Sequence, residues 1–119
     1  MRNQAILAIL QNLNAARDIN ASAVVSVDGL SMASAFPMDM DEDRIGAMSA
    51  AMVSLAVRVA KEVIQGRLDH AIVNTDNGYM LFFQVNESVL LVTTTPADAK
   101  LGLVLYDSQN ALQSLAAVL

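Results

Sequence analysis

The sequence contains no cysteine and no tryptophan, and it has only three phenylalanines and two tyrosines among 119 residues. Without cysteine the chain can form no disulfide framework and has no thiol chemistry, which favours a cytoplasmic protein. The shortage of aromatic rings argues against a surface on which nucleobases stack. The composition therefore gives no support to a disulfide-stabilised or single-strand-binding protein.

Charge is also scarce, because only 16% of the residues are charged and the net charge is −5. A nucleic-acid-binding surface must be basic to neutralise phosphates, so we expect no nucleic acid partner. No apolar run reaches the roughly 18 residues that a membrane helix requires. The sequence accordingly predicts no membrane insertion.

Hydrophobic residues, by contrast, make up 55% of the chain. A chain of this length supports one domain, which we expect over residues 1–119. The apolar content exceeds what one small core normally needs. The excess can serve a partner surface or cover a sheet that is apolar on both faces.

The hydrophobic periodicity predicts the order helix, two strands, helix, three strands, helix, and so an α+β fold. Asp28-Gly29 and Asn77-Gly78 mark hairpin turns. Asp39 can cap the second helix, which is expected to end at Gly66. Thr95 and the following proline indicate the start of the last helix. The expected helices cover residues 4–17, 41–65 and 95 onward, and the expected strands cover residues 23–27, 30–36, 68–75, 79–85 and 89–94.

Motifs that carry chemistry are missing from the sequence. It has no phosphate-binding loop, no dinucleotide fingerprint, no nucleophile elbow and no zinc-protease motif. The single histidine, His70, follows Asp69 on an expected strand, where a surface or partner-facing position is the simpler interpretation. The acidic run from Asp39 to Asp43 fits the first turn of a helix better than a metal site. We therefore expect no enzymatic activity and no cofactor.

The second helix carries an apolar arc of roughly 220°, far wider than a helix covered on one side needs. The arc divides into two stripes. The large stripe consists of Ile45, Met48, Met52, Leu55, Val59 and Val63, and the small stripe of Gly46, Ala50, Val53, Val57, Ala60 and Ile64. Large side chains fill a core, whereas small ones let another helix approach closely. We therefore expect the large stripe to face the sheet and the small stripe to meet a partner helix, unless another part of the chain covers it.

The order and spacing of these features resemble the Roadblock/dynein light chain family over nearly the whole chain. The resemblance is carried by the strand 23–27 with Asp28-Gly29-Leu30, the helix 41–65 closing at Gly66, the Asn77-Gly78 hairpin and Leu101-Gly102. It implies a profilin-like, five-stranded antiparallel sheet between one helix and a pair of helices. The form is similar to the bacterial and archaeal branch of gliding-motility proteins.

The same resemblance implies a homodimer, or a heterodimer with a paralogous Roadblock domain. The second helices would pair with each other, and so would the third strands, which adds His70, Ile72 and Asn74 to the expected interface. Members of this family are non-catalytic and bind small Ras-like GTPases or act as scaffolds. A purely scaffolding role or a small-molecule sensor is the alternative, although a sensor needs convergent polar groups in an apolar pocket.

Overall fold

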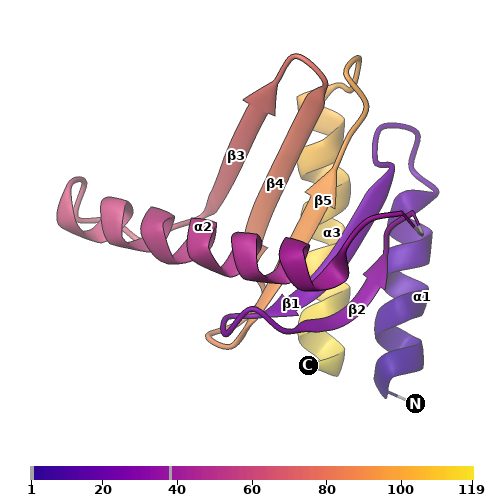
Figure 1. Cartoon of the computed structure of the whole chain (residues 1–119), viewed down its shortest axis with the longest axis horizontal. Helices are drawn as coiled ribbons and strands as arrows, with labels where there is room; N and C mark the ends of the chain where they lie inside the picture. The colour runs from indigo at the N-terminus through magenta and orange to yellow at the C-terminus, as the bar shows by residue number, and fades with distance from the viewer. Residues whose placement is uncertain (1, 38) are drawn as a thin grey trace.

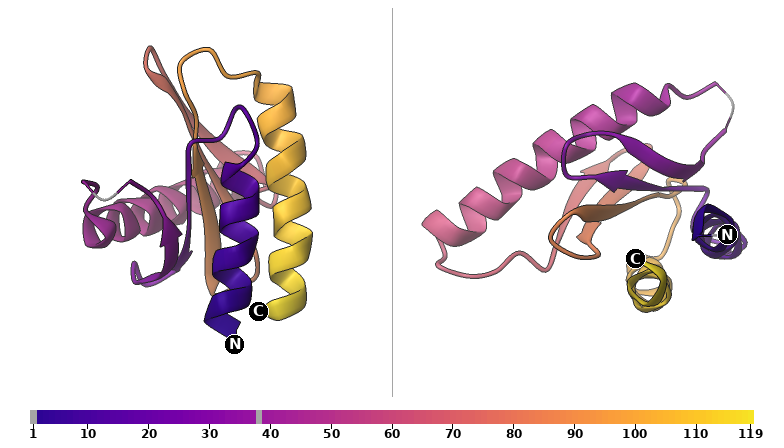
Figure 2. Two further views of the ribbon diagram at one scale, coloured as in Figure 1. Left: turned by 90° about the vertical axis from the view of Figure 1, so that its right-hand side faces the viewer. Right: turned by 90° about the horizontal axis from the view of Figure 1, so that it is seen from below.

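In the computed structural model, which describes residues 2–37 and 39–119, one antiparallel sheet lies between helices on both of its faces (Figures 1 and 2). The predicted order of helices and strands is confirmed. The elements are α1 (Arg2–Asn14), β1 (Ala21–Ser26), β2 (Ser31–Ala35), α2 (Glu42–Glu62), β3 (His70–Thr75), β4 (Gly78–Gln84), β5 (Val89–Thr94) and α3 (Leu101–Val118).

The five strands are arranged in the order β2-β1-β5-β4-β3, and all neighbouring strands are antiparallel. The two hairpins β1–β2 and β3–β4 are therefore joined through β5, which pairs with β1 on one side and β4 on the other. β3 forms one edge of the sheet, and within the described part of the chain it pairs only with β4.

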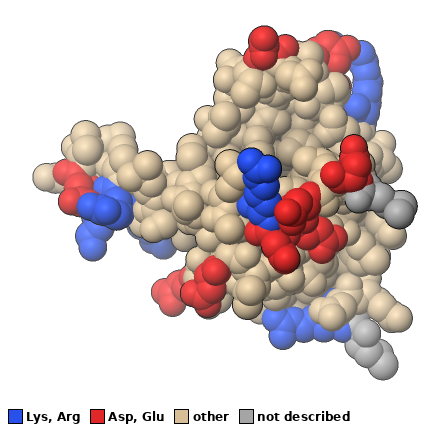
Figure 3. All heavy atoms as spheres, viewed as in Figure 1, with Lys and Arg blue, Asp and Glu red and all other residues tan. Residues whose placement is uncertain are grey.

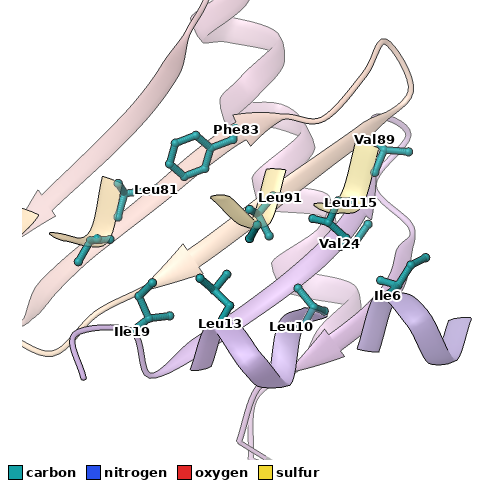
Figure 4. Packing of buried hydrophobic residues seen from close by; sticks show 12 residues of the cluster. Ile6, Leu10, Leu13, Ile19, Val24, Leu81, Phe83, Val89, Leu91 and Leu115 are labelled. Carbon is teal, nitrogen blue, oxygen red and sulfur yellow. The ribbon is translucent and has the colours of Figure 1, made fainter. Parts of the chain in front are cut away.

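The larger part of the core lies between the sheet and the pair α1 and α3, which run side by side on the same face (Figures 2 and 4). These two helices contribute apolar side chains at helical spacing, as the pattern predicts. The fully buried members of this cluster include Ile6, Leu10, Ile19, Val24, Leu81, Leu91, Val104 and Leu115.

The opposite face of the sheet carries a smaller core under α2. Val53 of α2 packs here with residues of β1, β4 and β5, namely Ala23, Val25, Phe82, Leu90 and Val92. Alternate residues of β1, β3, β4 and β5 thus belong to different cores, which explains why these strands are apolar on both faces.

The predicted hairpin turns exist, but both differ in detail. In the first, Gly29 alone has a positive φ, of 92°, and the Ser26 amide donates to the Leu30 carbonyl at 2.8 Å. The loop is therefore longer than the predicted two-residue turn. In the second, Thr75 pairs with Gly78, so the central residues are Asp76 and Asn77 rather than Asn77 and Gly78.

The last helix begins at Leu101, not at Thr95 as the sequence predicts. Thr95 instead continues the strand contacts, since its hydroxyl oxygen accepts from the Tyr79 amide at 2.8 Å and its amide donates to the Tyr79 carbonyl at 3.0 Å. The buried carboxylate of Asp18 then accepts from the Lys100 amide at 3.2 Å. Hydrogen bonds between residues far apart in the sequence thus keep Thr95 from capping the last helix.

The other boundaries move by a few residues. α1 ends at Asn14 rather than at residue 17, and β3 begins at His70 rather than at residue 68. None of the helices in the described ranges combines the length and the apolar character that a membrane crossing demands.

Candidate partner interface

The start of α2 is fixed by Asp41, not by Asp39 as the sequence predicts. The Asp41 carboxylate accepts from the amides of Asp43 and Arg44 at 3.1 and 3.2 Å, which satisfies two donors of the first turn. The predicted capping-box residue Glu42 instead accepts a hydrogen bond of 2.6 Å from the Ser34 hydroxyl of β2. α2 is therefore tied to the edge of the sheet at its first turn.

One turn further on, α2 lies directly against the β1–β2 hairpin. A Cβ atom on Gly46 would overlap the carbonyl oxygen of Gly29, and a Cβ on Gly29 would lie 3.3 Å from the Cα of Ala47. Backbone thus meets backbone at this crossing, which only glycine allows. This close approach decides which side of α2 can face the sheet.

The sheet-facing side of α2 is the small stripe, so the expected orientation of the two stripes is wrong. Gly46 and Val53 are buried within the chain, together with Ser49. Ala50, Val57 and Ala60 are half-buried, and Ile64 is exposed. Because the helix crosses so close to the hairpin, only small side chains fit between these two elements, and the large stripe lies to one side of this contact.

The large stripe consequently lies largely open to solvent. Met48 is 62% exposed, Leu55 58% and Val63 75%, while Ile45 and Met52 are half-buried. An apolar patch of this kind on one helix marks an interaction surface. The exposed stripe, and hence the candidate partner surface, is therefore the larger one, which sequence reasoning assigned to the core.

The C-terminal part of α2 projects past the edge strand β3, as Figure 1 and the right-hand view of Figure 2 show. The chain turns back after the helix, where the Gly66 amide donates to the Ala60 carbonyl at 2.8 Å. The residue with a positive φ in this turn is Gln65, at 60°, rather than the predicted Gly66. The end of α2 thus leaves its own sheet without a covering partner in the described chain.

A cleft of about 860 Å³ opens between α2 and the sheet, and we call it the α2 cleft. Its lining is mostly apolar and comes from α2, from the β4 and β3 strands and from the segment before α2. The lining residues are Phe36, Asp39, Met40, Asp41, Arg44, Ile45, Met48, Ser49, Ala51, Met52, Leu55, Val73, Met80, Phe82 and Thr94. The hydroxyl of Ser49 is buried and has no hydrogen-bond partner in the described part of the chain.

The edge strand β3 places the other three predicted interface residues. His70, Ile72 and Asn74 alternate with Ala71 and Val73, which pack on the side of α2. His70 and Ile72 are half-buried and Asn74 is exposed. The structure thus gathers these residues on the outermost strand, next to the projecting end of α2, while their contact with a partner stays a prediction.

The surroundings of His70 are those of a structural residue. Its ring lies 5.6 Å from the ring of Phe83, and its Nδ1 atom is 3.1 Å from the carboxylate of Asp69. Among residues 2–37 and 39–119, no three His, Cys, Asp or Glu side chains come together as a metal site would require.

Sequence reasoning missed the lining of the α2 cleft from the strands, namely Val73, Met80 and Phe82. One signal could have corrected the orientation of α2. Gly46 belongs to the small stripe of α2, and Gly29 lies in the hairpin that precedes this helix in the sequence. A glycine in each of two successive elements indicates that their backbones approach closely.

This arrangement defines a three-layered α+β fold with an exposed helix and an open sheet edge. Residues 5–95 match the model of the Roadblock/LC7 domain, and the chain belongs to this family. It is 33% identical over 110 residues to the protein MJ1340 of Methanocaldococcus jannaschii, covering 92% of this chain and 96% of the relative.

Solved structures agree with this fold. Myxococcus xanthus MglB superposes with a TM-score of 0.90 at 19% identity, covering 97% of this chain and 87% of MglB. The gliding protein mglB of Thermus thermophilus gives 0.83 at 16% identity, covering 98% and 90%. An MglB with a tetrameric arrangement gives 0.86 at 18%, covering 98% and 89%. Profilin IB of Acanthamoeba castellanii gives 0.66 at 10%, covering 93% and 96%, which confirms the profilin-like architecture.

Proposed function

We propose that this chain is a non-catalytic adaptor that forms a dimer and, as a dimer, binds and regulates a small Ras-like GTPase. The observation that carries the proposal is the projecting end of α2, whose exposed large stripe lies beside an open apolar cleft and an unpaired sheet edge. Membership of the Roadblock/LC7 family and the likeness to MglB support the same role.

The shape of a single chain supports the proposed dimer. In a twofold pair the same surface is used on both chains. If the two β3 edges pair, the projecting end of each α2 reaches over the partner's sheet and toward its α2 cleft. Each large apolar side chain that becomes buried stabilises the pair by about 1.5–3 kcal/mol. The partner is a second copy or a paralogous Roadblock domain.

The GTPase would dock on the side of α2 that faces away from the sheet. This side carries the small exposed residues Ala47 and Ser54. Next to them Arg58 forms an ion pair of 3.2 Å with Glu62. Small side chains on two adjacent helices would fit the broad surface of another protein, and they offer no side chain long enough to enter a deep site of that protein.

The direct test uses small Ras-like GTPases from the same genome, each loaded with GDP or with a non-hydrolysable GTP analogue. Titration with this chain, followed by calorimetry, should show one GTPase that binds in only one nucleotide state. The variant Ser54→Arg should weaken this binding at least tenfold and leave the mass of the dimer unchanged. Gln113→Arg on the exposed side of α3 serves as the control.

Absence of binding in either nucleotide state, with an intact dimer, would contradict the GTPase role and favour a scaffold. A small-molecule sensor is the second candidate, because the α2 cleft has the size of a ligand site, roughly 300–1,000 Å³. A sensor requires the cleft to stay open, so a monomer in solution would favour it.

A further inference from the structure

The two ends of α2 carry opposite charge. Asp39, Asp41, Glu42 and Asp43 are exposed at its start, where Arg44 is the only nearby cation among the described residues. At the other end, Lys61 and Arg67 are exposed in a chain whose net charge is −5. Figure 3 shows basic groups with some acidic ones at the projecting end, and acidic groups with one basic side chain gathered over the start of the helix.

Neighbouring charges at the projecting end leave these two cations available. Arg58 is already engaged with Glu62 at 3.2 Å, and Asp69 contacts His70 at 3.1 Å. Lys61 and Arg67 form no ion pair within the described part of the chain. Both line a hollow at the end of α2. We call this end of the helix, with Lys61 and Arg67, the α2 tip.

The acidic end belongs to the α2 cleft itself. Asp39 and Asp41 line the cleft, together with Arg44 and apolar side chains. Ser49 also lines the cleft, and its hydroxyl is fully buried without a hydrogen-bond partner in the described chain. The cleft thus offers an apolar floor and a negative rim.

We propose that the α2 cleft is filled by the α2 tip of a second copy of this chain, with Lys61 and Arg67 meeting the rim formed by Asp39 and Asp41. This inference rests on the dimer proposed above and adds the determinant of partner choice. An antiparallel pair of α2 helices places basic tip against acidic rim twice, once at each end. A parallel pair, or a paralogue with an acidic tip, would place like charges together, and such contacts suppress wrong partners.

Two charge-altered variants test the pairing rule. Lys61→Glu with Arg67→Glu makes the tip acidic, and Asp39→Lys with Asp41→Asn makes the rim basic while keeping a capping side chain at residue 41. Each variant alone should raise the dimer dissociation constant at least tenfold at low salt. Because screening weakens exposed charge pairs, the difference should shrink at 0.5 M salt.

A mixture of the two variants provides the sharper measurement. Each end contact is complementary again in the mixed dimer, so native mass spectrometry should find mixed dimers well above the half expected from random pairing. Matched controls carry similar charge changes elsewhere. Arg2→Glu with Lys100→Glu controls for the tip, and Glu87→Lys with Asp98→Asn controls for the rim.

The outcomes separate this inference from the proposed dimer. If the unaltered chain is a monomer at all concentrations, the dimer proposal itself fails. If the unaltered chain dimerises but the variants dimerise equally well and mix at random, only the charge rule is overturned. If the controls weaken the dimer as much as the tip and rim variants, net charge rather than this contact governs pairing, which also overturns the rule.

Discussion

At the scale of single residues, the fold is decided where backbones come close. Gly46 lies against Gly29, and no side chain fits between α2 and the hairpin at this point. This contact fixes the start of α2 against the hairpin, so that the small stripe faces the sheet. The exposure of the large stripe therefore depends on a glycine that is itself buried within the chain.

Replacing Gly46 by alanine should destabilise the protein. The added Cβ overlaps the Gly29 carbonyl, so the helix must shift, at a cost of about 1–3 kcal/mol. This cost exceeds the gain of up to about 1 kcal/mol that alanine brings to a helix. The measurement is the free energy of unfolding from urea titration followed by circular dichroism.

Gly102 of α3 is the matched control, because no described atom lies within 4 Å of a Cβ added there. Gly102→Ala should leave stability unchanged or raise it slightly, by up to about 1 kcal/mol. If both alanine variants had the same stability as the unaltered chain, the close crossing of α2 and the hairpin would be wrong.

At the scale of elements, α2 serves two surfaces along one helix. Its small stripe closes the minor core, with Val53 buried at 4% exposure, and its large stripe remains outside. A helix with two apolar stripes needs two partners, and the described part of the chain supplies only one of them. In the proposed dimer, α2 and the neighbouring edge strand β3 form a single surface for assembly.

Three glutamate substitutions on adjacent residues separate these roles. Leu55→Glu alters an exposed residue of the large stripe and should give a folded monomer, because a buried unpaired charge in the interface would be costly. Val53→Glu places the charge in the core and should prevent folding. Ser54→Glu lies on the exposed outer side and should remain a dimer. Light scattering and circular dichroism distinguish the three outcomes.

Hydrogen exchange measures how well the β3 amides are protected in the same variants. Amides of His70–Thr75 that face away from β4 should exchange slowly in the dimer and quickly in Leu55→Glu, since edge groups are satisfied only by pairing. A folded Leu55→Glu dimer in which β3 stays protected would contradict the role of the large stripe.

At the scale of the whole molecule, neither Arg58 nor Arg67 of the proposed regulator is suited to enter a nucleotide site. An arginine supplied to a transition state is worth about 10³–10⁵-fold in rate. Arg58 is held by Glu62 on the surface of a helix rather than on a long loop, and Arg67 follows the turn after α2. The chain would therefore act by holding the GTPase's own residues in place.

Arg58→Ala and Arg67→Ala should accordingly keep most of any stimulation of GTP hydrolysis. The measurement is single-turnover hydrolysis by the GTPase with saturating amounts of each variant, after its binding has been verified. A loss approaching a thousandfold in either variant, with binding intact, would show that this chain supplies an arginine.

The family resemblance implied the antiparallel character of the sheet, whereas the sequence by itself determined the element order and the double coverage of the sheet. These features follow from local periodicity and from strands such as β4, whose Leu81 and Phe82 both belong in a core. Hairpin positions could be located from Asp28-Gly29 and the residues around Asn77, because turns are specified by neighbours in the chain.

Only the tertiary structure decided where helices begin and which stripe of α2 faces the sheet. Thr95 lost its capping role to a hydrogen bond with Tyr79, sixteen residues away. The orientation of α2 depends on the distance between two backbones, at Gly29 and Gly46, which no periodicity records. A helical pattern tells which side chains share one face of a helix. How closely the neighbouring element approaches decides which of these faces points toward the core.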